Sequence, residues 1–200
     1  MAERKRLLRK IFTGARSRLP VDRTRALSEL ISQRLVALSF FSEARDIVLY
    51  AATAGEVLTD RIFREALAQG KRIFFPRADR QRKKLYLAQV SDLTQLKPGS
   101  YGVMEPDQGP FIEAGDLGNA LVCVPGVAFA KDGMRLGFGK GYYDRFLAEL
   151  NDGVVSVGLA FAFQLLDRLP HDPSDQYVNF VVTEYSVHPG KPLFSKPWMS

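Results

Sequence analysis

The sequence predicts a single three-layer α/β/α domain with a mostly parallel sheet and a helical amino-terminal segment over residues 1–40. Beyond that segment, short apolar runs rich in strand-forming residues alternate with stretches of helical periodicity. A glycine-rich loop joins one apolar run to a helical stretch. The chain has 200 residues, which is enough for one domain with a sizeable core and too few for two full ones. We therefore expect one domain over residues 1–200.

Two helices are expected in the amino-terminal segment. Apolar residues at helical spacing give the first helix one apolar face, formed by Leu7, Leu8, Ile11, Phe12 and Ala15. Lys5 and Arg9 are one turn apart and project from the same side of that helix. Pro20 ends the first helix and Asp22 is expected to cap the second. The apolar stripe of the second helix includes Leu27, Leu30, Ile31 and Leu35.

The rest of the chain alternates strands and helices. Apolar or alternating runs predict strands over residues 46–50, 72–76, 84–90, 120–125, 154–160 and 177–182. Helical segments are expected over residues 59–69, ended by Gly70, and over residues 143–150. Residues 91–118 are rich in Pro and Gly and predict a long surface excursion. Ligands of parallel sheets bind beyond the carboxyl ends of the strands, which here lead into loops 50–56, 125–141 and 161–175.

Composition and charge narrow the class of protein. The net charge of +6 favours an anionic partner. The densest basic patch, residues 80–84, lies between two predicted strands and is interpreted as a solvated hairpin loop rather than a nucleic-acid contact. The single cysteine, Cys123, falls in an apolar run and is expected in the core. No signal peptide or membrane-spanning run is evident, so a cytoplasmic location is expected, without nucleic acid or membrane as partners.

The loop over residues 135–145 carries the strongest chemical signal. Three alternating glycines (Gly137, Gly139 and Gly141) allow tight turns and close approach of the backbone to a bound group. Arg135 and Lys140 supply positive charge, and Asp144 follows three residues after the last glycine. Exposed amides, fixed cations and a carboxylate suited to Mg²⁺ are what a nucleotide polyphosphate requires.

The spacing does not match the commonest phosphate motifs. No Ser or Thr follows Lys140, as a P-loop requires, and the glycine spacing differs from the dinucleotide fingerprint. A flexible glycine linker is the plain alternative. The loop therefore indicates phosphate binding without specifying the fold.

Residues 124–144 resemble the signature of the 5-formyltetrahydrofolate cyclo-ligase family, also called 5,10-methenyltetrahydrofolate synthetases. The resemblance extends, in the family's order, to residues 5–9, 50–59, 75–77, 101–106 and 182–184. It implies conversion of 5-formyltetrahydrofolate to 5,10-methenyltetrahydrofolate, with Mg²⁺ as cofactor and ATP as co-substrate, and release of ADP and phosphate. ATP phosphorylates the formyl oxygen in this reaction, and N10 then attacks the formyl carbon.

The resemblance also implies roles for individual residues. It makes Lys140 and Arg135 the catalytic cations and Asp144 and Asp175 the metal ligands. The implied ATP contacts are Lys5, Arg6, Leu7, Leu8, Arg9, Arg135, Leu136, Gly137, Phe138, Gly139, Lys140, Gly141, Tyr142 and Tyr143. The implied folate contacts are Ala51, Glu56, Phe138, Gly139, Lys140, Gly141 and Tyr142.

Some of these positions have plain alternatives. Glu56 suits a pterin, because a carboxylate accepts two parallel hydrogen bonds from an aminopyrimidine edge, but an acid at a helix start is also favoured by the helix dipole. Tyr142 and Tyr143 either stack on ligand rings or pack within the protein. Ala51 and Asn179 depart from the family, which often has a larger apolar residue at the first position and an acid at the second.

Two other functions compete with the cyclo-ligase. One is a catalytically inactive relative that binds RNA or protein through its basic surface. The other is a kinase or ligase of the same architecture that acts on another heterocycle. The combination of Lys140, Asp144 and Glu56 favours the enzyme, because a binding module has no use for it. We expect a monomer whose partners are reduced folate and ATP.

Overall fold

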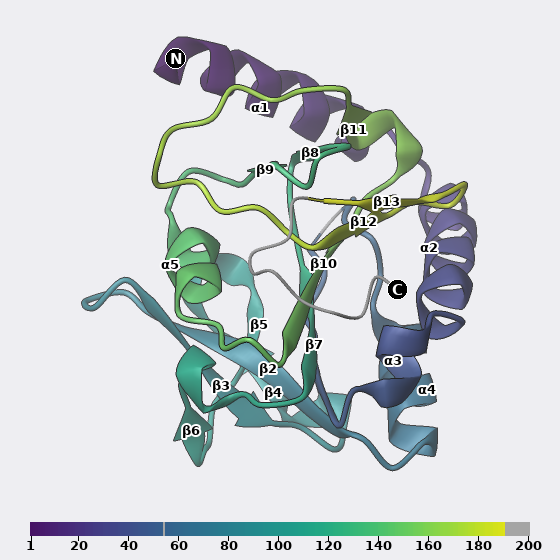
Figure 1. Cartoon of the computed structure of the whole chain (residues 1–200), viewed down its shortest axis with the longest axis vertical. Coiled ribbons are helices and arrows are strands. Elements are labelled where there is room, and N and C mark those ends of the chain that lie inside the picture. Colours follow the sequence, from purple (N-terminus) through teal and green to yellow (C-terminus); the bar gives the residue numbers. More distant parts are fainter. Residues whose placement is uncertain (54, 191–200) are drawn as a thin grey trace.

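The chain folds around one large, mostly parallel sheet. The computed structural model describes residues 1–53 and 55–190 (Figure 1). In this part of the chain, eight strands lie in the order β13-β12-β10-β7-β1-β2-β3-β6. The five central neighbours, β12 to β2, pair in parallel, while β13, β3 and β6 join by antiparallel pairs. The strands are β1 (Asp46–Val48), β2 (Arg72–Asp79), β3 (Lys84–Gln89), β6 (Phe111–Ile112), β7 (Ala120–Val124), β10 (Val154–Leu159), β12 (Phe180–Val182) and β13 (Val187–Pro189).

Helices cover both faces of this sheet, which confirms the predicted fold class. Helices α2 (Val21–Val36), α3 (Ser39–Glu43) and α4 (Asp60–Ala68) pack on one face, and α5 (Tyr142–Ala148) packs on the other (Figure 1). Successive residues of a strand point to opposite faces, so Leu121 and Cys123 of β7 meet the first layer, and Val122 meets the second. Burial raises the pKa of the Cys123 thiol to about 12, and the free cysteine is a core residue as predicted.

Helix α1 (Ala2–Ser17) lies apart from these layers, over a smaller sheet. That sheet has the order β11-β8-β9 and comprises β11 (Leu165–Leu166), β8 (Ala128–Ala130) and β9 (Arg135–Leu136). Phe12 of α1 packs there in a separate apolar cluster with residues that include Val127 and Met134. Figure 1 shows α1 at the top of the molecule, above β8, β9 and β11. The helix is thus placed beside the glycine-rich loop.

The predicted apolar face of α1 is wrong in part. Leu7 and Ile11 are more than half exposed, whereas Lys5, Phe12 and Arg16 are buried. The helix is rotated because the charged ends of Lys5 and Arg16 find partners on the body of the protein. Hydrophobic periodicity does not detect such long-range ion pairs.

Other differences concern boundaries and short elements. Helix α2 starts at Val21 after Pro20, so Asp22 lies inside its first turn and does not cap it. The last parallel strand starts at Phe180, three residues later than predicted. The predicted surface excursion over residues 91–118 contains β4 (Leu96–Pro98), β5 (Met104–Pro106) and β6. Short 3₁₀ turns occur at Leu93–Gln95, Ser100–Gly102, Ala114–Asp116 and Ala162–Gln164.

No helix among residues 1–53 and 55–190 is both long enough and apolar enough to cross a bilayer. The predicted end of the domain, residue 200, lies outside the described residues.

Candidate active site

A cavity of about 430 Å³ opens at the carboxyl ends of β1, β2 and β7. The chain runs from β1 to β2 on one side and later from β7 to β10 on the other, so the cavity lies where the direction of strand order reverses. Loops 50–56 and 125–141 both line it, as expected from their positions after β1 and β7. Its volume suits a small-molecule ligand.

Most of the predicted site residues share this cavity. Those that line it are Ala51, Glu56, Arg135, Gly137, Phe138, Gly139, Lys140, Gly141, Tyr142, Tyr143 and Asp144. Leu136 is buried in β9 below the loop. Residues 5–9 lie on α1, where the Arg9 Nε donates a 2.8 Å hydrogen bond to the carbonyl of Gly137. Arg6 and Leu7 are exposed, and Leu8 packs on the cluster around Phe12.

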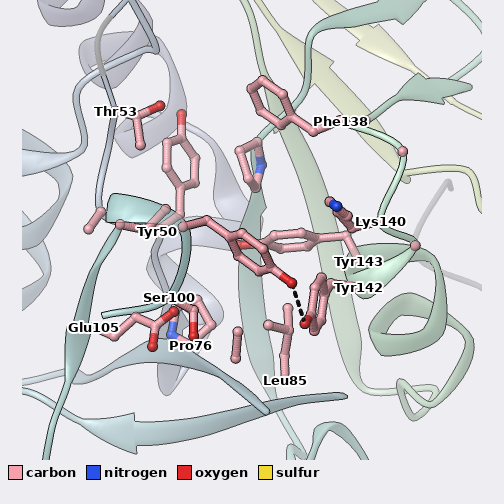
Figure 2. A pocket seen from close by; sticks show the side chains of 18 of the residues that line it. Tyr50, Thr53, Pro76, Leu85, Ser100, Glu105, Phe138, Lys140, Tyr142 and Tyr143 are labelled. Atoms are coloured by element: carbon pink, nitrogen blue, oxygen red, sulfur yellow. Dashed lines mark hydrogen bonds between the residues drawn. The ribbon is translucent and has the colours of Figure 1, made fainter. Parts of the chain in front are cut away.

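The glycine-rich loop has the backbone shape that its sequence predicts. Gly139 has φ +89° and Gly141 has φ +70°, in a region that residues with a side chain rarely adopt. A Cβ on Gly139 would lie 3.3 Å from the guanidinium of Arg9. Gly141 immediately precedes α5, so the loop ends at a helix start. This arrangement brings the glycines and the Lys140 side chain to the same wall of the cavity, and Figure 2 shows Lys140 on the same side as Phe138 and Tyr142.

Gly139→Val is expected to damage this loop selectively. A β-branched side chain is strained at φ +89° and crowds Arg9. We expect ATP affinity to fall strongly, while folate affinity stays within about threefold of the unmodified protein. Isothermal titration with each ligand separately measures both effects. Equal losses for the two ligands would contradict a loop that serves the phosphates.

Lys140 is exposed at the mouth of the cavity. Its ammonium lies 5.6 Å from the centroid of the Tyr101 ring. Within the described part of the chain, no carboxylate pairs with it. Lys140 is therefore a cation in reach of an anionic ligand without first breaking an ion pair.

Two other predicted phosphate-binding cations are paired with the predicted metal ligands. Arg135, which is 6% exposed, donates a 2.8 Å hydrogen bond from Nη2 to Asp144 Oδ1. The Lys5 ammonium pairs with Asp172 at 2.7 Å and also with Asp175. Burial by itself lowers the pKa of Lys5, but its hydrogen bonds to Asp172 and Asp175 outweigh burial and raise that pKa overall. Arg135 and Lys5 are thus each neutralised by a carboxylate, whereas Lys140 is not.

Few acidic side chains of the described residues are placed to bind a metal ion. Among residues 1–53 and 55–190, no group of three or more His, Cys, Asp or Glu side chains is placed to hold a metal ion. Asp144 lines the cavity, and Asp175 lies in the loop that follows β11. Hard carboxylate oxygens fit Mg²⁺, which usually takes one or two carboxylates plus substrate phosphates and waters. Asp144 is therefore an acid at the cavity wall that suits such a cation, whereas Asp175 is not among the described residues that line the cavity.

Asn179 has a structural task. Its Oδ1 accepts 2.8 Å hydrogen bonds from both the backbone N–H and the hydroxyl of Ser156 in β10. Its own backbone N–H donates to the Ser156 hydroxyl. The side chain thus holds β10 beside the segment that enters β12.

Glu56 is a buried carboxylate in the cavity wall, with 7% exposure. Its Oε2 accepts a 2.9 Å hydrogen bond from the backbone N–H of Thr53, and its Oε1 lies 3.4 Å from Arg16 Nη2. Helix α4 begins only at Asp60, so Glu56 precedes the helix. A carboxylate has about four acceptor directions, which leaves two for a ligand.

Tyr50 stabilises the loop that carries Glu56. The Tyr50 hydroxyl donates to the carbonyl of Val57 at 2.9 Å, and the Thr59 hydroxyl donates to the Tyr50 carbonyl at 2.9 Å. Burial raises the pKa of Tyr50 well above its usual range, so the phenol stays neutral and keeps its donor. These bonds hold the ends of the loop together.

The two tyrosines of the loop have different surroundings. Tyr142 is half-buried, and its hydroxyl lies 3.2 Å from that of Tyr101, which also lines the cavity (dashed line in Figure 2). Tyr143 packs against Phe146 and beneath the guanidinium of Arg135. Burial raises the pKa of Tyr143. Both tyrosines line the cavity, and Tyr142 contacts its far side through Tyr101 whereas Tyr143 packs on α5 and Arg135.

The sequence did not single out about half of the cavity wall. These lining residues are Tyr50, Thr53, Pro76, Ala78, Leu85, Ser100, Tyr101, Val103, Glu105 and Pro125. The resemblance over residues 50–59, 75–77, 101–106 and 124–144 was a signal for seven of them, and it left out only Ala78, Leu85 and Ser100. In the structure, Tyr101 also has φ +59°, a strained conformation for a residue with a side chain.

Comparison with known proteins shows which family the chain resembles. The model of the 5-formyltetrahydrofolate cyclo-ligase family matches residues 1–184. The solved structure of the Aquifex aeolicus 5,10-methenyltetrahydrofolate synthetase is similar, with TM-score 0.82, 35% identity and 96% coverage of both chains. The Mycoplasma pneumoniae synthetase is similar with TM-score 0.72 and 28% identity, over 90% of this chain and 98% of that one. The mouse 5-formyltetrahydrofolate cyclo-ligase is 30% identical over 86% of this chain and 93% of its own.

These matches span almost the whole chain and carry one activity in their names, so the chain is an enzyme of folate one-carbon metabolism. It belongs to the 5-formyltetrahydrofolate cyclo-ligase family.

Proposed function

We propose that the cavity binds 5-formyltetrahydrofolate and ATP together and joins the formyl carbon to N10 at the expense of ATP. The observation that carries the proposal is the composition of the cavity wall. One wall presents the buried carboxylate of Glu56, and another presents the glycine-rich loop with Lys140. A single cavity thus offers acceptors for a pterin edge and donors for phosphates.

The reaction needs a leaving group in place of the formyl oxygen. Transfer of the γ-phosphoryl group forms a bond between phosphorus and that oxygen, and ADP departs. N10 then attacks the formyl carbon and loses its proton, and the carbon–oxygen bond breaks so that phosphate leaves with the electron pair of that bond. Little covalent chemistry falls to the protein in such a transfer, which depends on positioning and on charge stabilisation.

The glycine-rich loop would supply the charge stabilisation. The amides near Gly139 and Gly141 and the unpaired ammonium of Lys140 would bind the phosphates. Arg135 would contribute once it exchanges Asp144 for a phosphate oxygen. Arg9, bonded to the Gly137 carbonyl, would hold the loop in place from α1.

Glu56 would supply the positioning of the folate. Its two oxygens are fixed by Thr53 and Arg16, so the carboxylate plane is set before a ligand arrives. Two acceptor directions remain for the N–H groups of the aminopyrimidine ring. Tyr142 and Phe138 would flank the ligand at the entrance, and Ala51 leaves room beside the ring.

We further propose that Asp144, which lines the cavity, and Asp175 would hold Mg²⁺. When bound, the ion supplies positive charge to the phosphate oxygens. In the present structure, Arg135 and Lys5 neutralise these two carboxylates. Nucleotide phosphates would attract the two cations and so free the acids.

Asp144→Asn is expected to weaken Mg²⁺ binding more than folate binding, because an amide is a poorer ligand for a hard cation. The apparent Mg²⁺ affinity is measured by isothermal titration in the presence of ADP, and rates are measured over a range of Mg²⁺ concentrations. Excess Mg²⁺ should recover part of the lost rate. A loss indifferent to Mg²⁺ would mean that Asp144 serves only to hold Arg135.

The direct test of the proposal is a steady-state assay that follows the methenyl chromophore. Product should form only when 5-formyltetrahydrofolate, ATP and Mg²⁺ are all present, with one ADP per product. Product formation without ATP, or no product under any condition, would contradict the proposal.

We also propose four further properties of the protein. They are one domain over residues 1–200, a monomeric state, a cytoplasmic location, and the absence of nucleic-acid or membrane partners. A sedimentation measurement tests the second of these.

A further inference from the structure

Arg16 is the most deeply buried cation near the cavity, although it lies in the last turn of α1. It is 4% exposed. Its Nε donates a 2.9 Å hydrogen bond to the carbonyl of Gly55, and its Nη1 donates to the carbonyl of Gly126 at 3.4 Å. Its Nη2 lies 3.4 Å from Glu56 Oε1. One guanidinium thus joins α1 to the loops that follow β1 and β7.

The backbone around Arg16 is closely fitted. Gly55 has φ +77°, and a Cβ there would lie 3.0 Å from the carbonyl oxygen of Arg16. The loop therefore needs a glycine at this contact, both for its conformation and for space. The ring of Phe138, in the glycine-rich loop, lies 5.7 Å from the guanidinium carbon. Arg16 therefore contacts both the glycine-rich loop, which is proposed to bind phosphates, and Glu56, which is proposed to bind folate.

We infer that Arg16 is a positioning residue that orients Glu56 toward the pterin edge and couples the folate half of the cavity to the glycine-rich loop. The inference rests on the proposed role of Glu56 in binding folate. Arg16 is not among the described residues that line the cavity, so it acts through Glu56 and Phe138 and does not touch the ligand.

The physical reason lies in the geometry of the carboxylate. Recognition of an aminopyrimidine requires both carboxylate oxygens in the plane of the ring. The Thr53 N–H holds one oxygen and Arg16 holds the other, so rotation of the Glu56 side chain is opposed at both ends. A planar guanidinium with several donors satisfies Gly55, Gly126 and Glu56 together, which a lysine ammonium on a flexible stem cannot do.

A buried ion pair also has a merely structural interpretation, in which Arg16 holds α1 to the body and affects folate only through stability. A double-mutant cycle separates the two. If Arg16 acts through Glu56, its removal costs folate affinity only while Glu56 is present. If it acts through general stability, its removal costs the same in either background.

The first experiment measures the Kd of 5-formyltetrahydrofolate by isothermal titration for the unmodified protein, Arg16→Met, Glu56→Gln and the double variant. We expect each single variant to weaken binding by roughly tenfold or more, and the double variant to match Glu56→Gln within about twofold. Additive losses would overturn the inference. The double variant removes both charges, so it leaves no buried unpaired carboxylate and is expected to fold even if Arg16→Met does not.

The second experiment measures how an ATP analogue changes the affinity for folate in the variant Arg16→Lys. This variant keeps the positive charge and loses the planar set of guanidinium donors. In the unmodified protein, a non-hydrolysable ATP analogue with Mg²⁺ should tighten folate binding by about fivefold or more. In Arg16→Lys this factor should fall close to one. An unchanged factor in the variant, or no coupling in the unmodified protein, would overturn the inference.

Arg18→Met is the matched control, because Arg18 is exposed at the C-cap of α1, two residues after Arg16, and its replacement loses the same charge. It should leave both the folate Kd and the coupling unchanged. The outcomes also separate this inference from the proposed function. If Glu56→Gln keeps full folate affinity, the proposed folate site is wrong; if it loses affinity while both Arg16 variants keep theirs, only the role of Arg16 is wrong.

Discussion

Lys140→Ala is expected to lower turnover by roughly 10²–10³-fold at saturating ATP, by analogy with the loss of one preorganised donor to a developing charge. Lys140 is the cation of the glycine-rich loop that no carboxylate of the described chain neutralises. Arg135 and Lys5 compensate only in part, because each is held by an acid. Steady-state rates of methenyl formation measure the effect.

A suitable control is Lys131→Ala. Lys131 lies before the same loop and is largely exposed, with an ion pair to Asp167 on the surface. Its replacement should leave turnover within about twofold of the unmodified protein, as expected for an exposed pair. Full activity of Lys140→Ala at saturating ATP would mean that this loop does not serve the transferred phosphoryl group.

Glu56→Gln is expected to raise the folate KM and to leave the ATP KM near its original value. The amide places a donor where the pterin needs a second acceptor, which costs about 1.5–3 kcal/mol. That free energy corresponds to roughly a 10- to 150-fold rise in KM. Initial rates over a matrix of folate and ATP concentrations separate the two constants.

Asp60→Asn is the control for Glu56→Gln, since Asp60 is an exposed acid in the first turn of α4. Its replacement should affect neither KM, whereas a helix-dipole role for acids in this region would make the two variants alike. A rise in the ATP KM of Glu56→Gln with an unchanged folate KM would mean that the cavity is not divided as proposed.

The sheet was predictable because its signal is local. Strand β7 is buried on both faces and is a short, continuous apolar run, while β1 and β10 each carry one polar residue (Asp46 and Ser156) in a mostly apolar run, which is typical of parallel sheets. The glycine-rich loop was predictable for a similar reason. Its glycines, cations and acid are neighbours in the sequence, and its position after β7 places it at the edge where ligands bind.

The rest of the site depends on contacts between distant residues. Arg16 looks like an ordinary exposed residue of an amphipathic helix until Gly55, Glu56 and Gly126 surround it. Lys5 is buried for the same kind of reason, through Asp172 and Asp175. Short strands such as β4 and β5 carry too few residues for a periodic signal, so the wall around Tyr101 and Glu105 was seen only through the family resemblance.

The central claim is that the γ-phosphoryl group of ATP is transferred to the formyl oxygen inside this cavity. The most direct measurement uses 5-formyltetrahydrofolate with ¹⁸O in the formyl group and follows the label by mass spectrometry of the released phosphate. The account predicts that one labelled oxygen enters phosphate for each methenyl product formed. Label found in water, with unlabelled phosphate, would contradict it.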